Sequence, residues 1–165
     1  MQIKTAKTKK DSADISTLAH KIWHEHYPTI ITTEQIDYML AKFQSPEAIE
    51  ADIASGTIYL MAYQEDKFVG YTAFYQQENE LFLSKLYIDP SHHRQGIGKT
   101  LFARVTAHAK EQNLPTIRLY VNKYNSNSIE AYKKMGFTVE KALITDVGNN
   151  FIMDDYTMTY NTTKL

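Results

Sequence analysis

Three β-rich runs in close succession, within residues 57–88, constrain the fold of this chain more than any other feature. They read TIYLMAYQ, KFVGYTAFYQQ and ELFLSKLYI, and the short polar segments EDK and EN punctuate them. Connections this short join antiparallel strands, because a parallel pair needs a crossover of a dozen or more residues. The chain is therefore predicted to contain an antiparallel meander of three strands.

Helix-like and strand-like patterns flank this meander on both sides. A short strand at Ile3–Ala6 precedes it, followed by a helix over residues 11–27, whose apolar side chains recur at helical spacing. Helices over 32–43 and 45–56 come next, with Thr32 and Ser45 as their expected N-caps. After it come a helix (96–113), a strand (116–121), a helix (126–136) and two strands (138–147 and 151–160) around a Gly-Asn-Asn turn. The order predicts an α/β (α+β) fold, a mixed central sheet of about seven strands with helices on both faces.

Length and composition favour one ordinary domain. The chain has 165 residues, so we expect a single domain over 1–165, and its formal net charge of −1 provides no electrostatic basis for binding nucleic acid or an anionic membrane. The absence of cysteine excludes a disulfide framework and a thiolate nucleophile. No secretory signal or membrane-spanning run is evident, so a cytoplasmic location is expected.

The segment HHRQGIGKTLF, residues 92–102, contains fragments of two phosphate-binding motifs. Its GKT resembles the end of a P-loop, but that motif needs a glycine where this chain has His93. Its GIG resembles the start of a dinucleotide-binding fingerprint, but Leu101 stands where the third glycine belongs. Neither an NTPase nor a Rossmann dehydrogenase is indicated.

What remains is a glycine-containing turn, residues 93–98, that leads into an amphipathic helix. Glycines let the backbone approach a ligand closely, and the N–H groups and dipole at a helix start favour an anion. Arg94 and Lys99 add positive charge. The alternative is that the glycines serve tight packing alone, and the turn by itself does not decide between the two.

A second motif, NSNSIEAYKKMGF at residues 125–137, makes the interpretation specific. With the turn, it resembles the GNAT superfamily of acetyl-CoA-dependent N-acetyltransferases, whose phosphate motif reads Gln/Arg-x-x-Gly-x-Gly/Ala. That family's next motif reads Asn-x-x-Ala/Ser-Ile-x-x-Tyr-x-Lys-x-Gly-Phe, and LSKLYIDP resembles its fourth strand. The residues that match the second motif are Asn125, Ser128, Ile129, Tyr132, Lys134, Gly136 and Phe137. One departure is His93, which replaces the Gln or Arg of the phosphate motif.

The resemblance implies acetyl-CoA as co-substrate, with no metal. The pyrophosphate of CoA is expected on the turn and the pantetheine arm along the preceding strand. The implied binding residues are Leu86, Tyr87, Ile88, His93, Arg94, Gln95, Gly96, Ile97, Gly98, Lys99, Asn125 and Tyr132. A cap made by Asn127 with Glu130 would leave Asn125 outside the last helix.

Acetyl transfer to an amine requires a proton acceptor for the ammonium and a proton donor for the departing thiolate. By resemblance, Tyr132 is the candidate acid, with packing beside Ile129 as the alternative. The family's usual base position on its fourth strand falls near Phe82, which cannot serve. Glu80, on the same strand face, is the candidate base, and a solvated hairpin residue is the alternative. A water chain to another acid or a histidine is equally open.

In the GNAT fold the first two helices border the acceptor site. Trp23, His26, Tyr27 and Tyr38 are therefore the candidate acceptor-pocket residues, against the alternative of core packing. The acceptor is expected to be a primary amine of a small molecule. A protein or peptide acceptor, and an acyl-CoA-binding sensor without turnover, stay open, and the resemblance allows a homodimer.

Two further features have simple explanations. His20 and His24 have metal-ligand spacing, but they lie opposite the apolar face of their helix and are interpreted as a solvated face. Asp154 falls among the apolar residues of one face of the last strand. It should therefore be paired, at a bulge or functional, unless the regular strand starts only at Asp155.

Overall fold

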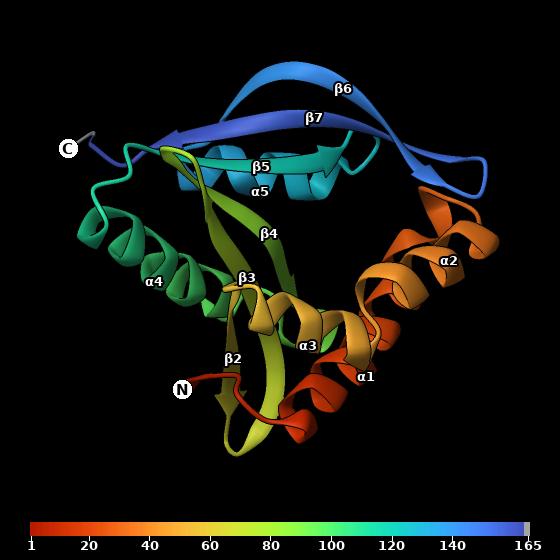
Figure 1. The fold of residues 1–165 in the computed structure, drawn as a ribbon, viewed down its shortest axis with the longest axis horizontal. Coiled ribbons are helices and arrows are strands. Elements are labelled where there is room, and N and C mark those ends of the chain that lie inside the picture. The colour runs from red at the N-terminus through yellow and green to blue at the C-terminus, as the bar shows by residue number, and fades with distance from the viewer. Residues whose placement is uncertain (164–165) are drawn as a thin grey trace. The chain divides into compact units, whose positions relative to one another are not determined.

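A computed structural model of the chain describes residues 1–163. Within them it has seven strands and five α-helices, in the predicted order (Figure 1). The elements are β1 (Gln2–Thr5), α1 (Lys9–His26), α2 (Thr33–Phe43), α3 (Pro46–Ala54), β2 (Ile58–Gln64), β3 (Lys67–Gln77), β4 (Glu80–Ile88), α4 (Ile97–Glu111), β5 (Thr116–Asn122), α5 (Ser126–Met135), β6 (Thr138–Gly148) and β7 (Phe151–Asn161). Short 3-10 turns at Tyr27–Thr29 and Pro90–His92 follow α1 and β4.

The strands form one mixed sheet in the order β1-β2-β3-β4-β5-β7-β6. β1 pairs antiparallel with β2, and β2 with β3. β4 pairs parallel with β5 over Glu80–Phe82, and β7 pairs antiparallel with both β5 and β6. The seven-stranded mixed sheet predicted from the sequence is confirmed.

The chain divides into two compact units. The first contains Met1–Tyr75 and Lys85–Arg104, and the second contains Gln76–Ser84 and the chain from Val105 onward. β4 and α4 each continue from one unit into the other.

The first three helices of the chain begin at capped N-termini. Thr8 and Asp11 form a capping box before α1: the hydroxyl of Thr8 accepts from the Asp11 N–H, and the Asp11 carboxylate accepts from the Thr8 N–H. Thr32 and Ser45 accept from the third residue of α2 and α3 in the same way. The predicted caps at Thr32 and Ser45 are confirmed, whereas α1 begins two residues earlier than predicted because of Thr8.

A buried polar network lies under α2 and α3. Lys85 of β4 is 7% exposed, and its ammonium donates to the carbonyl oxygen of Phe43 at 2.7 Å and to the hydroxyl of Tyr59 at 2.6 Å. Tyr59 donates in turn to Asp52 of α3 at 2.6 Å, and Asp52 lies 3.7 Å from Lys85. Burial lowers the pKa of Lys85 to about 8, although Asp52 opposes that shift.

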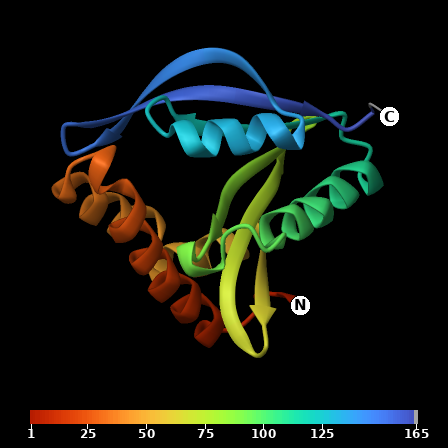
Figure 2. The same cartoon turned by 180° about the vertical axis from the view of Figure 1, so that it is seen from behind.

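In the second unit, α5 packs against one face of the β5–β7 region, as both ribbon views show (Figures 1 and 2). The helix ends at Gly136, whose φ of 112° lies in the left-handed region that only glycine adopts without strain. The ring of Phe137, directly after it, lies 5.5 Å from the ring of Tyr160 on β7. At the other end of β7, the turn Asn149–Asn150 has both φ values positive and closes the predicted hairpin.

Two details of the sequence interpretation are confirmed in this unit, and one changes. The last strand starts at Phe151 as predicted, and not at the alternative start Asp155, and Asp154 is paired, since its carboxylate lies 2.9 Å from the ammonium of Lys123. The N-cap position of α5 is Asn125 rather than Asn127, so the expected Asn127 cap is wrong. The Asn125 side chain makes no capping hydrogen bond, and it is 4% exposed.

Candidate active site

The turn at residues 93–98 is built as an anion site would require. Gly96 occupies the N-cap position of the fifteen-residue helix α4, because its carbonyl oxygen accepts from the N–H of Thr100 at 3.0 Å. The first N–H groups of a helix have no partner within the helix, so those that follow Gly96 are available to a ligand. Arg94 and Lys99, one on each side, have exposed side chains.

Gly96 is where the turn requires glycine. Its φ is 79°, and a Cβ added there would meet no atom within 4 Å. The requirement is therefore conformational, and the open space beside the residue fits the close approach of a phosphate group. The Thr100 hydroxyl donates back to the Gly96 carbonyl at 2.9 Å, so this side chain is used within the first turn of α4.

His93, the residue that departs from the family pattern, holds the turn against the preceding strand. Its Nε2 lies 3.1 Å from the carbonyl oxygen of Ile88, so a protonated Nε2 donates to it. The backbone N–H of His93 donates to the Pro90 carbonyl at 3.3 Å. The side chain thus connects the turn to the end of β4.

Asp89 anchors the start of the same turn. It is 1% exposed, and its carboxylate accepts from Lys21 of α1 at 2.7 Å and from the Ser91 N–H and hydroxyl at 3.1 and 2.9 Å. Burial alone would raise the pKa of Asp89. The hydrogen bonds from Lys21 and Ser91 together outweigh this effect and lower the pKa to about 2.

Three of the four candidate acceptor residues form one aromatic cluster in the first unit. The ring of Trp23 lies 4.3 Å from that of Tyr27 and 6.0 Å from that of Tyr87, which is a residue of β4. His26 packs edge-on against Tyr27 at 5.0 Å. The indole N–H of Trp23 is buried and has no hydrogen-bond partner among residues 1–163. The fourth candidate, Tyr38, accepts a hydrogen bond from Lys42 at 3.3 Å.

In the second unit, the candidate acid Tyr132 lies on α5. It is half-buried, and its ring packs edge-on against Phe137 at 5.7 Å. The Tyr132 ring therefore packs against an apolar neighbour, as the alternative to a catalytic role allowed. The proton-donor role of its hydroxyl stays a prediction.

The candidate base Glu80 is held in a two-pronged ion pair. Its two carboxylate oxygens accept from Nε and Nη2 of Arg118 at 2.7 and 2.9 Å, and Arg118 also contacts Glu140 of β6. Arg118 lowers the pKa of Glu80, which makes its carboxylate a weaker proton acceptor. The pairing argues against Glu80 as the base, a role that stays a prediction without support from its contacts.

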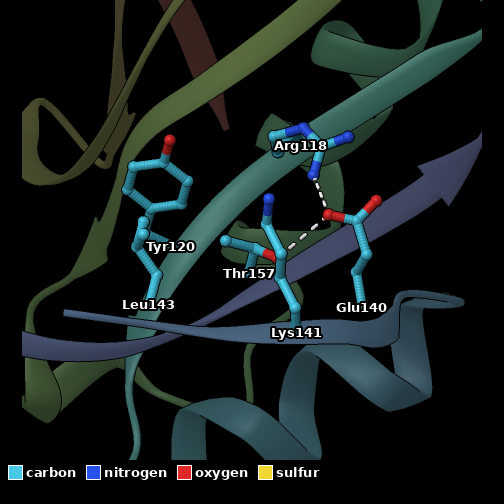
Figure 3. Close-up of a pocket in the computed structure, with 6 residues that line it drawn as sticks. All are labelled: Arg118, Tyr120, Glu140, Lys141, Leu143 and Thr157. Atoms are coloured by element: carbon cyan, nitrogen blue, oxygen red, sulfur yellow. Dashed lines mark hydrogen bonds and ion pairs between the residues drawn. The ribbon is translucent and has the colours of Figure 1, made fainter.

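A shallow pocket of about 360 Å³ lies on the sheet face of the second unit (Figure 3). Arg118 and Tyr120 of β5, Thr157 of β7, and Glu140, Lys141 and Leu143 of β6 line it. Arg118 is a residue that sequence reasoning missed, because an isolated Arg in the run TIRLYV does not reveal its two carboxylate partners.

None of the helices in residues 1–163 combines the length and the apolar character that crossing a bilayer requires. In the same part of the chain, no three Asp, Glu or His side chains are grouped so as to hold a metal ion.

Comparison with known proteins gives consistent results. The sequence model of the Acetyltransferase (GNAT) family matches residues 17–137. A spermidine N(1)-acetyltransferase of Thermoplasma acidophilum is 30% identical over 149 residues, which cover 86% of this chain and 90% of that protein. Human N-acetyltransferase 8 is 28% identical over 126 residues, which cover 73% of this chain and 52% of that protein. The crystal structure of the PaiA N-acetyltransferase of Thermoplasma acidophilum, in complex with coenzyme A, superimposes with a TM-score of 0.82 at 26% identity and covers 98% of this chain and 99% of that one.

The family match spans both motifs from which the resemblance was inferred, and the fold agrees along nearly the whole chain. The predicted fold and the predicted enzyme class, an acyltransferase, are confirmed. The chain belongs to the Acetyltransferase (GNAT) family.

Proposed function

We propose that this chain transfers the acetyl group of acetyl-CoA to a primary amine of a small molecule. The observation that carries the proposal is the turn at 93–98, where Gly96 begins α4 with a positive φ and open space beside it. Family membership supplies the reaction class. The spermidine acetyltransferase among the relatives makes polyamines the first acceptors to test.

In this proposal, the turn binds the pyrophosphate of CoA through backbone N–H groups, with Arg94 and Lys99 adding charge. Gln95, Ile97 and Gly98 contribute through the backbone. The side chain of Ile97 is 1% exposed, so it packs inward rather than toward the ligand. The strand residues Leu86, Tyr87 and Ile88 align the pantetheine arm, and Asn125 contacts it. When bound, acetyl-CoA supplies an activated acyl group, and the protein supplies position and protons.

The acid role is assigned to the Tyr132 hydroxyl. An ordinary phenol, with a pKa near 10, stays protonated at neutral pH and donates to a departing thiolate. The aromatic cluster of Trp23, His26 and Tyr27 is proposed to border the acceptor, since aromatic faces attract ammonium groups. Tyr38 is kept as a fourth contact.

A panel of amines tests the function. Thiol release from acetyl-CoA is measured with polyamines, simple alkylamines and peptides, and we expect turnover with small primary amines, polyamines foremost. Tight CoA binding without turnover on any of them would instead favour an acyl-CoA sensor. Turnover confined to peptides would favour a protein acetyltransferase.

Two variants separate binding from chemistry. Tyr132→Phe should lower kcat at least about tenfold and leave the Kd of CoA unchanged, because it removes only a proton donor. Gly96→Val should weaken CoA binding, because a β-branched residue is strained at a φ of 79°. Normal turnover in Tyr132→Phe removes that residue as the acid, and normal CoA affinity in Gly96→Val removes the turn as the phosphate site.

A cytoplasmic location and a homodimeric state belong to the proposal as well. The first rests on the cysteine-free sequence. Analytical ultracentrifugation of the purified chain tests the second.

A further inference from the structure

Asp155, in the middle of β7, is a buried acid to which the proposed function assigns no role. Its side chain is 5% exposed, and its Oδ1 is buried without a hydrogen-bond partner among residues 1–163. An unpaired buried carboxylate costs free energy, and such exceptions in a folded protein call for an explanation.

The strand register shows what surrounds this carboxylate. Asp155 is directly opposite Asn122 of β5 and Leu143 of β6, and directly paired residues of antiparallel strands point to the same face. Asn122 is itself buried and is the last residue of β5, three residues before Asn125. In sheets with parallel strands, ligands bind at the carboxyl ends of those strands. Asp155 therefore lies at the ligand-binding edge of β5.

The same face carries the pocket shown in Figure 3. Leu143, the cross-strand partner of Asp155, lines that pocket, and so do Tyr120 and Thr157, which form the next pair along β5 and β7. Alternation along β7 places Asp155 and Thr157 on this face, one pair apart. Asp155 is not itself one of the lining residues; it lies one pair beyond Thr157 on the same strand face, opposite the lining residue Leu143.

The neighbouring acid has a different environment. Asp154 points to the opposite face, where its Oδ1 lies 2.9 Å from the ammonium of Lys123, an ion pair without hydrogen-bond geometry, whereas Asp155 has no cation beside it in the part of the chain that the structure describes. The charged residues on the Asp155 face are Arg118 on β5 and Glu140 and Lys141 on β6, and the first two are bound to each other. Burial, and then the charge of Asp154, raise the pKa of Asp155 to about 6.

We propose that Asp155 is a catalytic residue that accepts the proton which the acceptor ammonium must lose before it attacks the thioester. One N–H bond of the ammonium breaks, an O–H bond forms at the Asp155 carboxylate, and the freed nitrogen lone pair forms the new C–N bond. As the C–S bond breaks, the thiolate takes the proton of Tyr132, and the tyrosine recovers a proton from the same nitrogen. Asp155 then releases its proton to solvent. This inference rests on the proposed function.

The experiment compares Asp155→Asn with the matched variant Asp154→Asn, in pH profiles of kcat/KM with the most active amine of the panel. Asp155→Asn should lower kcat/KM by about 100-fold and abolish the acidic limb of the profile. Asp154→Asn should keep most of the activity and shift that limb to lower pH, because it removes the charge that raises the Asp155 pKa. Both variants should bind CoA normally.

The possible outcomes separate the two proposals. Wild-type protein that turns over no amine overturns the proposed function, whereas an active wild type and an unchanged Asp155→Asn profile overturn only the role of Asp155. If Asp155→Asn does not fold, carbon-13 NMR titration of the wild-type Asp155 carboxyl decides. A midpoint near 6 supports the role, and a midpoint at the ordinary value of about 3.9 overturns it.

Discussion

Asp89 in the first unit and Asp155 in the second are both buried aspartates, yet their surroundings are opposite. Asp89 accepts hydrogen bonds from Lys21 and Ser91, which hold its pKa at about 2. Asp155 has an oxygen without a partner and a like charge beside it, and its pKa is raised to about 6. The contrast shows that burial alone does not determine what a carboxylate does.

The difference matches the tasks proposed for the two regions. A turn that receives phosphate must keep its shape, so its anchoring acid is paired and permanently charged. A group that exchanges protons with an amine must bind a proton reversibly near neutral pH. Stability and reactivity are therefore assigned to different acids.

The same substitution at both positions gives the largest expected effect at Asp89. Asp89→Asn should lower the free energy of unfolding by about 2 kcal/mol at pH 7, because it removes the ion pair with Lys21. A lowered carboxyl pKa gives stability that is present above about pH 4 and lost as pH falls toward 2. Urea denaturation of both proteins at pH 7 and at pH 2.5 measures this difference.

The difference should shrink to about 1 kcal/mol or less at pH 2.5, because the carboxylate of Asp89 is then partly protonated in the folded protein as well. If the two proteins instead remain about 2 kcal/mol apart at pH 2.5, packing rather than charge is the reason, and the contrast with Asp155 fails.

Asp155→Asn should have a smaller effect of opposite sign. A raised carboxyl pKa gives stability that is present below about pH 4 and lost as pH rises through 6. Removing the charge should therefore stabilise the protein by about 1–2 kcal/mol at pH 7.5 and leave it unchanged at pH 4. Thermal or urea unfolding at both pH values provides the measurement, and destabilisation at pH 7.5 would show that the carboxylate has a partner that holds it.

Lys85 extends the comparison to a buried base, with the smallest expected effect. The pKa of Lys85, about 8, lies below the ordinary value of 10.5. At pH values between these two pKa values, the unfolded chain therefore binds more protons than the folded one. Stability from this group should therefore rise by about 1 kcal/mol from pH 7.5 to 9 in the wild type. Lys85→Met should lack that rise, whereas Lys110→Met, at an exposed position of α4, should keep it. A rise of equal size in Lys85→Met would assign the effect to another group.

The architecture was readable from the sequence because its signals are local. Apolar periodicity, the caps at Thr32 and Ser45, and the Asn149–Asn150 turn each act within a few residues, and each is found where expected. The family motifs are local as well, since the turn and the start of α5 are short contiguous segments.

The charge environments were not readable, because they depend on residues far apart in the chain. Lys85 meets Phe43 and Tyr59, and Arg118 meets Glu80 and Glu140, over separations that no pattern in the sequence marks. The sequence drew attention to Asp154, an acid among apolar neighbours, but that residue is paired. Strand alternation together with the register to β5 was needed to single out Asp155.

The strand order also has a consequence for solubility. β6, eleven residues long, is the last strand of the sheet, and an open edge of that length invites pairing with another molecule and aggregation. Irregular pairing between Val139 and Lys141 and between Asp146 and Gly148 interrupts its ladder with β7, and it carries charged side chains along its length. Such interruptions and charges are the features that keep natural edge strands from pairing edge to edge. They make continuous β6-to-β6 pairing unfavourable, so the free edge of this sheet is protected against fibre-like growth.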